Sequence, residues 1–223
     1  MRITEADHEA VTRAVAEAEL TTSGEIVTVV ARTSDGYTDV ALSIAAFLAF
    51  TKLVALAFFP DLTLGIIDSL TGGWNTEWTP AGLFGLASGI GIATFLIVYA
   101  LLLIPAVRFA LIPGRVKTLR VEDAAIRHFK VGAERRTHGR TGVLIYVSLQ
   151  EHRAQIVADE AIAAKVDPEV WGAAMVDMLR EIKAGDLGAG IAAGVRDVGV
   201  VLSEHFPRAD DDQNELPDRL IAL

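Results

Sequence analysis

Two long apolar segments in the middle of the chain limit what it can fold into. The first covers residues 40–59 and is interrupted only by Ser43, Thr51 and Lys52, and the second covers residues 81–107 without a single charge. Each is long enough to cross a hydrocarbon core about 30 Å thick. We therefore expect a transmembrane hairpin over residues 40–112, with spans at about 40–59 and 81–107.

The distribution of basic residues around this hairpin predicts its orientation. The loop over residues 60–80 holds three acids and no Lys or Arg, whereas basic residues flank both spans, at Arg32, Arg108, Arg115, Lys117 and Arg120. Loops rich in Lys and Arg remain in the cytoplasm. We expect a protein of the bacterial inner membrane, with the lipid bilayer as its first partner and with both termini and the polar part in the cytoplasm.

Lys52 lies within the first span, nearer its outer end, and two interpretations of it stay open. It could contact an acid of a partner protein, or its long side chain could reach the outer interface. Small residues in both spans, Ala41, Ala45 and Ala49 in the first and Gly85 and Gly89 in the second, predict close packing of the two helices within the hairpin.

Composition excludes several classes of function. The 223 residues contain no Cys, which excludes disulfides, thiolate zinc sites and cysteine nucleophiles. The net charge is −9 and no basic face is evident, so we expect no nucleic-acid partner. The polar start of the chain is typical of a helix cap and not of a signal peptide, so the hairpin itself must direct the chain to the membrane.

The polar sequence on both sides of the hairpin shows the periodicities of a mixed α/β domain. The predicted elements are helices at 4–20, 116–131, 168–184 and 186–206, and strands at 25–33, 143–149 and 153–159. Neither side has enough strands to close a core alone. Residues 1–36 and 113–207 are therefore expected to fold together as one domain, and the hairpin is an insertion into it.

The end of the chain and the last helix carry further signals. Residues 208–223 form an acidic tail that ends in a short apolar peptide, which is either a docking peptide or disordered. Glycines recur in the last helix although each weakens it by roughly 1 kcal/mol relative to Ala. We expect these glycines, at positions 188, 190, 194 and 199, to allow close approach of the sheet or of a neighbouring helix.

Four acids at strand ends are the candidate metal ligands: Glu25, Asp35, Glu151 and Asp159. If the strands pair, some of these carboxylates could converge at one edge of the sheet. Ca²⁺ and Mg²⁺ take several oxygen ligands, and such an ion could polarise a phosphoryl oxygen. Alternatively, these acids lie at strand ends because water solvates them there. Glu25 is the strongest candidate, because a charge beside a buried strand requires an explanation.

A basic, glycine-containing segment precedes the second predicted strand. Its candidate binding residues are Arg135, Arg136, His138 and Arg140. Guanidinium groups and exposed amides in such a segment could bind an anion, or they could lie against anionic lipid headgroups. A structural turn, with Arg140 paired to an acid, is the third interpretation.

Common catalytic motifs are missing from the sequence. It contains no HExxH, GxSxG, DxDxT, GxxxxGK[ST] or GxGxxG pattern. The His residues are scattered, and His128 is predicted to be a core residue on an apolar helix face. Any hydrolase activity would therefore require a bound metal ion.

Several segments together resemble one family. They are residues 140–145, 148–153 and 156–159, Trp171, residues 205–207, the strand start at 24–27 and the helix beginning after Thr4. As a set they are similar to the TPM domain, and the resemblance implies an α/β/α sandwich with a small sheet. It also implies one of two functions, either a phosphatase with an acidic cleft for Ca²⁺ or Mg²⁺, or an accessory protein of membrane complexes.

Taken together, these observations favour a membrane-anchored accessory or binding module. We expect it to bind a membrane-protein partner in such a complex or a divalent cation, Ca²⁺ or Mg²⁺. The alternative is a metal-dependent acid phosphatase, which rests on the family resemblance and on the acids at the strand ends.

Overall fold

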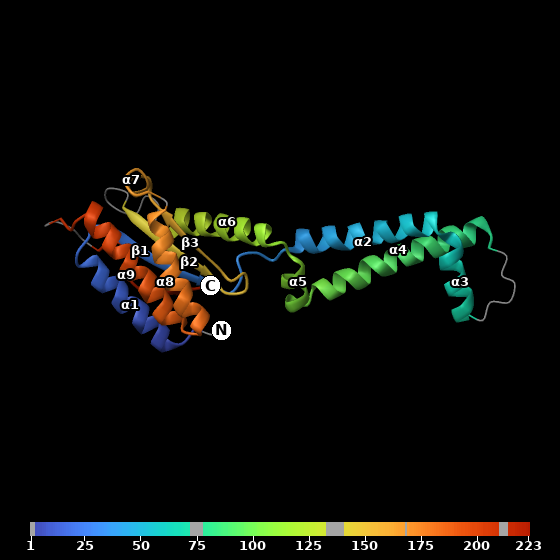
Figure 1. The fold of residues 1–223 in the computed structure, drawn as a ribbon, viewed down its shortest axis with the longest axis horizontal. Coiled ribbons are helices and arrows are strands. Elements are labelled where there is room, and N and C mark those ends of the chain that lie inside the picture. The colour runs from blue at the N-terminus through green and yellow to red at the C-terminus, as the bar shows by residue number, and fades with distance from the viewer. Residues whose placement is uncertain (1–2, 72–77, 133–140, 168, 210–213) are drawn as a thin grey trace. The chain divides into compact units, whose positions relative to one another are not determined.

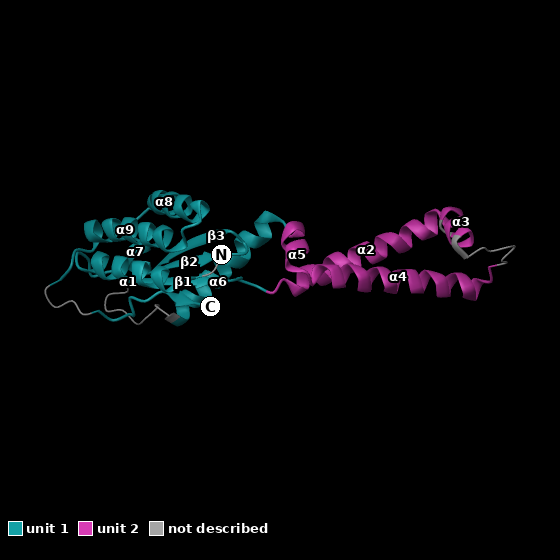
Figure 2. Ribbon diagram, turned by 90° about the horizontal axis from the view of Figure 1, so that it is seen from below, with its two compact units in different colours: residues 1–35, 113–223 teal, residues 36–112 magenta. Residues whose placement is uncertain are grey.

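A computed structural model of the chain describes residues 3–71, 78–132, 141–167, 169–209 and 214–223 (Figure 1). Its elements are α1 (Glu5–Glu19), β1 (Glu25–Ala31), α2 (Thr38–Phe58), α3 (Pro60–Thr71), α4 (Pro80–Leu102), α5 (Pro105–Leu111), α6 (Gly114–Gly132), β2 (Gly142–Ser148), β3 (Arg153–Ala158), α7 (Glu160–Ala163), α8 (Val170–Ala184), α9 (Leu187–His205) and β4 (Ile221–Ala222). They form two compact units, here called the α/β unit (Met1–Asp35 and Pro113–Leu223) and the hairpin unit (Gly36–Ile112), which Figure 2 distinguishes by colour.

The α/β unit is built on one four-stranded sheet with the order β3-β2-β1-β4. β1 pairs in parallel with both β2 and β4, and β2 pairs antiparallel with β3. Helices α1, α8 and α9 cover one face of this sheet, and α6 covers the other (Figures 1 and 2). The predicted mixed α/β fold is confirmed.

All seven residues of β1 are buried. Their side chains point alternately to the two faces of the sheet, and helices cover both faces. Ile26 and Val30 pack into the core beneath α1, α8 and α9, whereas Val27, Val29 and Ala31 pack into the core beneath α6. A strand that is covered on both faces reads as a continuous apolar run. This is the pattern on which the strand was predicted.

Asp7 fixes the start of two helices at once. One of its carboxylate oxygens, Oδ2, accepts hydrogen bonds from the backbone N–H and the hydroxyl of Thr4, both at 2.7 Å, and so completes the capping box of α1. The other oxygen, Oδ1, accepts the N–H of Gly188 in the first turn of α9 at 2.9 Å. Burial raises the pKa of Asp7, but these hydrogen bonds and nearby His8 outweigh it and lower the pKa below its ordinary value.

Local signals set most of the boundaries in this unit. The observed α6 and α9 agree with the predicted helices at 116–131 and 186–206 to within two residues. Gly185 ends α8 with a φ of 102°, the left-handed conformation expected of a glycine stop. The helix predicted from residue 168 begins two residues later, at Val170.

The hairpin unit packs α2 against α4 through small residues, but not through all of those predicted. Ala41, Ala45 and Ala49 are buried as expected. On α4 the prediction for Gly85 and Gly89 is wrong, because both glycines face open space. Gly91 makes the close approach instead, and a Cβ there would lie 3.2 Å from the side chain of Leu53.

The predicted end of the second apolar segment also needs correction. The second segment was expected to continue to residue 107, but α4 ends at Leu102 and Pro105 opens a separate short helix, α5. Proline at the first position of a helix is favourable, whereas proline inside one breaks it. The loop between the spans also contains a helix that was not predicted, α3.

The end of the chain is folded onto the sheet, so the interpretation of the described tail as disordered is wrong. Ile221 and Ala222 form β4 at the free edge of β1, and the Leu223 N–H donates to the carbonyl of Val30 at 2.9 Å. Leu216 is buried in the core beneath α6, and Leu220 in the core on the opposite face. The apolar peptide predicted to dock does so on its own domain.

Candidate functional site

The four candidate metal ligands are divided between the two ends of the sheet. Glu25 starts β1 opposite Gly142, and the N–H of Asp159 donates to the carbonyl of Gly142, so these two acids lie at one end. Asp35 and Glu151 lie at the other end, beyond the last residues of β1 and β2. Seven strand residues span about 20 Å, so one ion cannot bridge the two pairs.

Glu25 is buried and holds the C-terminal segment in place. Its side chain is 4% exposed, and its two carboxylate oxygens accept the backbone N–H groups of Glu215 at 3.3 Å and Leu216 at 3.1 Å. A buried carboxylate requires such donors, because an unpaired charge is very unfavourable in a protein interior. These hydrogen bonds are the reason for a charge beside a buried strand.

Glu151 is equally buried, with 2% of its surface exposed, and it joins the two parallel strands at their carboxyl ends. One oxygen accepts the N–H of Ser34, just after β1, at 2.8 Å, and the other accepts the hydroxyl of Ser148, the last residue of β2. The Ser34 hydroxyl also lies 3.1 Å from the Tyr146 hydroxyl. Ser34, Tyr146 and Ser148 were not predicted, because isolated Ser and Tyr residues carry no spacing signal.

Tyr146 and His128 stack beside this cluster, with ring centroids 5.6 Å apart. His128 was predicted to be a core residue, but its side chain is exposed on α6, so that prediction is wrong. Partial burial of its ring, together with the charge of Arg127, lowers the pKa of His128. Burial raises the pKa of Tyr146, so this hydroxyl stays protonated at neutral pH.

The remaining two acids have different surroundings. Asp35 forms a salt bridge with Arg120 of α6, at 3.3 Å between Nε and Oδ2, and both side chains are partly exposed. Asp159 is 4% exposed and precedes the short helix α7. The predicted anion-binding or headgroup-binding residues Arg135, Arg136, His138 and Arg140 lie outside the described residues.

The described residues contain no cluster of acidic, His or Cys side chains of the kind that binds a metal ion. Within those residues, no three or more His, Cys, Asp or Glu side chains lie close enough together to hold an ion. Ca²⁺ takes six to eight oxygen ligands. A cation at either end of the sheet would therefore need backbone carbonyls and water in addition to one acidic pair.

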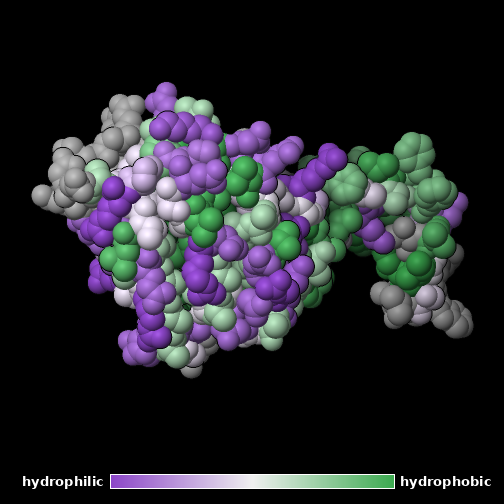
Figure 3. Space-filling model, turned by 60° about the vertical axis from the view of Figure 1, so that its left-hand side comes forward, coloured by the Kyte–Doolittle hydropathy of each residue, from purple (hydrophilic) through white to green (hydrophobic). Residues whose placement is uncertain are grey.

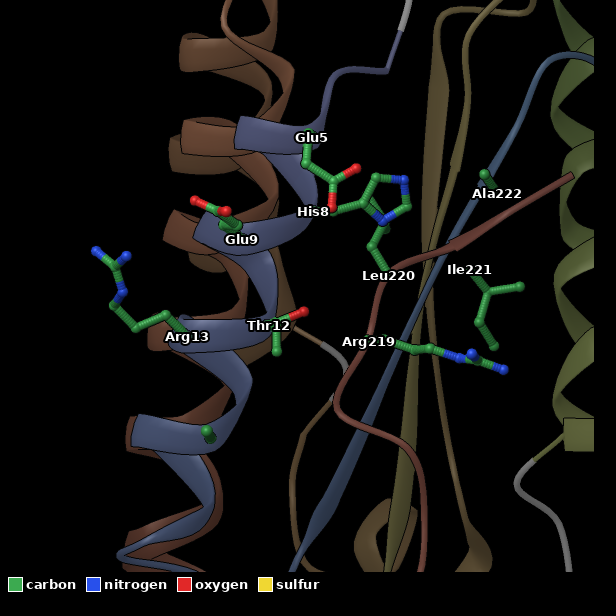
Figure 4. Close-up of a pocket in the computed structure, with 10 residues that line it drawn as sticks. Glu5, His8, Glu9, Thr12, Arg13, Arg219, Leu220, Ile221 and Ala222 are labelled. Atoms are coloured by element: carbon green, nitrogen blue, oxygen red, sulfur yellow. The ribbon is translucent and has the colours of Figure 1, made fainter.

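An open groove of about 830 Å³ runs between α1 and the C-terminal segment. Figure 4 shows Glu5, His8 and Glu9 of α1 on one side, with Arg219 and Ile221 on the other. Acidic and basic side chains both line the groove, so its charge does not favour a strongly anionic or a strongly cationic ligand.

The fold places this chain among mixed α/β proteins that also carry two candidate membrane helices. Residues 109–201 match the model of the TPM domain family. The match runs from α5 into α9 and confirms the resemblance seen at residues 140–159. The resembling segments at 24–27 and 205–207 lie outside it.

One solved structure supports the same fold. It is the NMR structure of the BA42 protein from the psychrophilic bacterium Bizionia argentinensis, with a TM-score of 0.57 and 18% sequence identity. The comparison covers 100% of this chain and 97% of the other. At this identity the likeness shows a shared fold alone. Among curated proteins no significant match was found.

Proposed function

We propose that this protein is anchored in a membrane by α2 and α4 and that its α/β unit is a non-enzymatic accessory or binding module for a membrane complex. The proposal rests on the structural role of the two buried glutamates. Glu25 and Glu151 accept backbone N–H groups and hold the fold together from opposite ends of the sheet. Under this proposal the two carboxylates hold the fold and do not act on a substrate as an acid, a base or a metal ligand.

The surface of the hairpin unit supports the membrane anchor. The helices α2 and α4 contain 21 and 23 residues, and only 17% and 11% of their most apolar windows are buried. Core helices of soluble proteins would be mostly buried. Large apolar side chains cover this unit instead, as the green regions of Figure 3 show, and they include Phe47, Phe50, Phe58 and Phe84. Lipid is the solvent that such a surface requires.

The proposed orientation, with the α/β unit in the cytoplasm, has a direct test. Because the chain contains no Cys, a single engineered thiol reports its own location. In intact cells, a membrane-impermeant maleimide should modify Ser69→Cys on α3 and leave Glu204→Cys on α9 unmodified until the cells are broken. Both residues are exposed. The opposite labelling pattern would place the α/β unit outside, and labelling of both sites would contradict a spanning hairpin.

The alternative function is a metal-dependent phosphatase, and one observation favours it. Asp35 and Glu151 lie beyond the carboxyl ends of the parallel strands β1 and β2, which is where open α/β sheets bind ligands. Under our proposal, the full chain in detergent hydrolyses p-nitrophenyl phosphate no faster than a protein-free control, with or without Mg²⁺ or Ca²⁺. Metal-dependent hydrolysis that Asp35→Asn removes, while Asp177→Asn on the surface of α8 does not, would establish the phosphatase.

The accessory role also predicts that the protein has a stable membrane-protein partner. The intact protein, purified from its own membranes in a mild detergent, should co-elute with a membrane protein at a fixed ratio. Less of the same partner should be recovered with Gly190→Ala, which destabilises the α/β unit, and the same amount with Gly172→Ala, which does not. A chain that elutes alone from chemically cross-linked membranes would contradict the accessory role.

A further inference from the structure

The hairpin unit contains an apolar cavity of about 380 Å³ where its three longer helices meet. Leu53 and Ala57 of α2, Leu64 of α3 and Leu83 and Ala87 of α4 are among the residues that line it. Its volume falls in the range of about 300–1,000 Å³ that is typical of sites for small molecules. Every lining residue is apolar except one, Trp78.

Trp78 brings a hydrogen-bond donor that none of the described residues accepts. Its indole Nε1 is buried and has no hydrogen-bond partner among the described residues. The indole N–H can only donate, and when buried it normally finds an acceptor. An acceptor on a bound molecule would satisfy it. The cavity therefore combines an apolar body with one donor at its wall.

These two features select the chemistry of the ligand. Because none of the described residues that line the cavity is charged, it does not suit an ion. Trp78 lies two residues before Pro80, the first residue of α4. If α4 spans the bilayer, as the proposed function requires, Trp78 lies at the membrane interface, where tryptophan is enriched.

We propose that this cavity binds one acyl chain of a membrane phospholipid and that the ester carbonyl of that lipid accepts a hydrogen bond from Trp78 Nε1. The inference rests on the proposed membrane anchor, because only a spanning hairpin brings the cavity to the level of the lipid esters. The acyl chain lies between α2, α3 and α4, and the headgroup stays at the interface.

Three variants separate this site from ordinary lipid contact. Ala87→Phe fills the cavity with a ring. Ala93→Phe adds the same ring to α4 at an exposed position outside the cavity and is the matched control. Trp78→Phe keeps an aromatic ring and removes the donor.

The test uses the full chain in nanodiscs that contain a phosphatidylglycerol with a photoreactive diazirine in its acyl chain. After irradiation, mass spectrometry should locate most of the adducts on residues 53–57 and 83–87, and not on exposed Leu96 and Leu101 of α4. Ala87→Phe should abolish these adducts and Ala93→Phe should keep them. Trp78→Phe should reduce them about fivefold, the effect of one ordinary hydrogen bond. Helical content measured by circular dichroism shows whether each variant is folded.

The outcomes separate the cavity from the anchor. Adducts spread evenly around α4, or unchanged in the folded Ala87→Phe variant, would overturn the lipid site. In a parallel experiment, membranes are washed with alkaline carbonate. Release of the protein into the supernatant would overturn the membrane anchor and the lipid site with it, whereas retention combined with evenly spread adducts would overturn the lipid site alone.

Discussion

Replacing Glu25 with alanine should lower the free energy of unfolding of the α/β unit by about 3 kcal/mol, because hydrogen bonds to a charged group contribute roughly 1.5–3 kcal/mol each. The carboxylate accepts two backbone N–H groups, and that of Leu216 is buried. Without it, the segment that carries Leu216, Leu220 and β4 loses these two hydrogen bonds to the start of β1. The segment should detach in the variant before the rest of the unit unfolds.

Hydrogen exchange on the full chain in detergent measures both effects. Amides of residues 216–223 should exchange much faster in Glu25→Ala. Exchange of the β2 amides should become faster only by the amount that the lower free energy of global unfolding predicts. Glu17→Ala, an exposed acid on α1, is the matched control and should change neither. The loss should be the same in EDTA and in Ca²⁺. A stabilising effect of Ca²⁺ that disappears in Glu25→Ala would instead make this residue a metal ligand.

Glu25 was predicted to be a metal ligand, whereas in the structure it anchors the C-terminal segment. The sequence could not identify that distant partner. The position of Glu25 at a strand start and the need for an explanation of its charge were local properties, and both were predicted. Its partner Leu216 is 191 residues away. β4 contains only two residues, which is too short for a periodic pattern. The sequence therefore left open whether the end of the tail docks or is disordered.

The distribution of the candidate acids has a similar cause. The hairpin of β2 and β3 could be predicted, since only a short turn separates two apolar segments. The direction in which β1 joins that hairpin could not, because more than a hundred residues, including the membrane segments, lie between β1 and β2. Parallel pairing puts Glu25 with Asp159 at one end and Asp35 with Glu151 at the other. Either direction of pairing puts two of the four acids at each end of the sheet, and the direction of β1 decides only which acids share an end.

The close packing of the glycines on α9, in contrast, was predicted from the helix stability that each glycine costs. Each should weaken the helix, so a compensating close approach was expected, and the structure locates it at neighbouring helices. A Cβ at Gly188 would lie 2.8 Å from the Asp7 backbone of α1, and one at Gly199 would lie 2.7 Å from the Ala18 side chain. The tightest contact with α8 is at Gly190.

Gly190→Ala should therefore destabilise the α/β unit by about 2 kcal/mol, because overpacking typically costs about 1–3 kcal/mol and exceeds the gain in helix propensity. The new Cβ would lie 2.8 Å from the carbonyl oxygen of Met178 and 2.6 Å from Cγ1 of Ile182. The carbonyl belongs to the backbone of α8, so the clash can be relieved only by moving that helix.

Gly172→Ala provides the opposite case on α8 itself. This glycine is exposed, and nothing lies within 4 Å of a Cβ built there. The same added methyl group should stabilise the unit by up to about 1 kcal/mol through helix propensity alone. Urea titrations of both variants in detergent, followed by the fluorescence of Trp171, test the pair. If Gly190→Ala were neutral or stabilising, α8 and α9 would not be packed as closely as the structure places them, and the glycines of α9 would have no packing role.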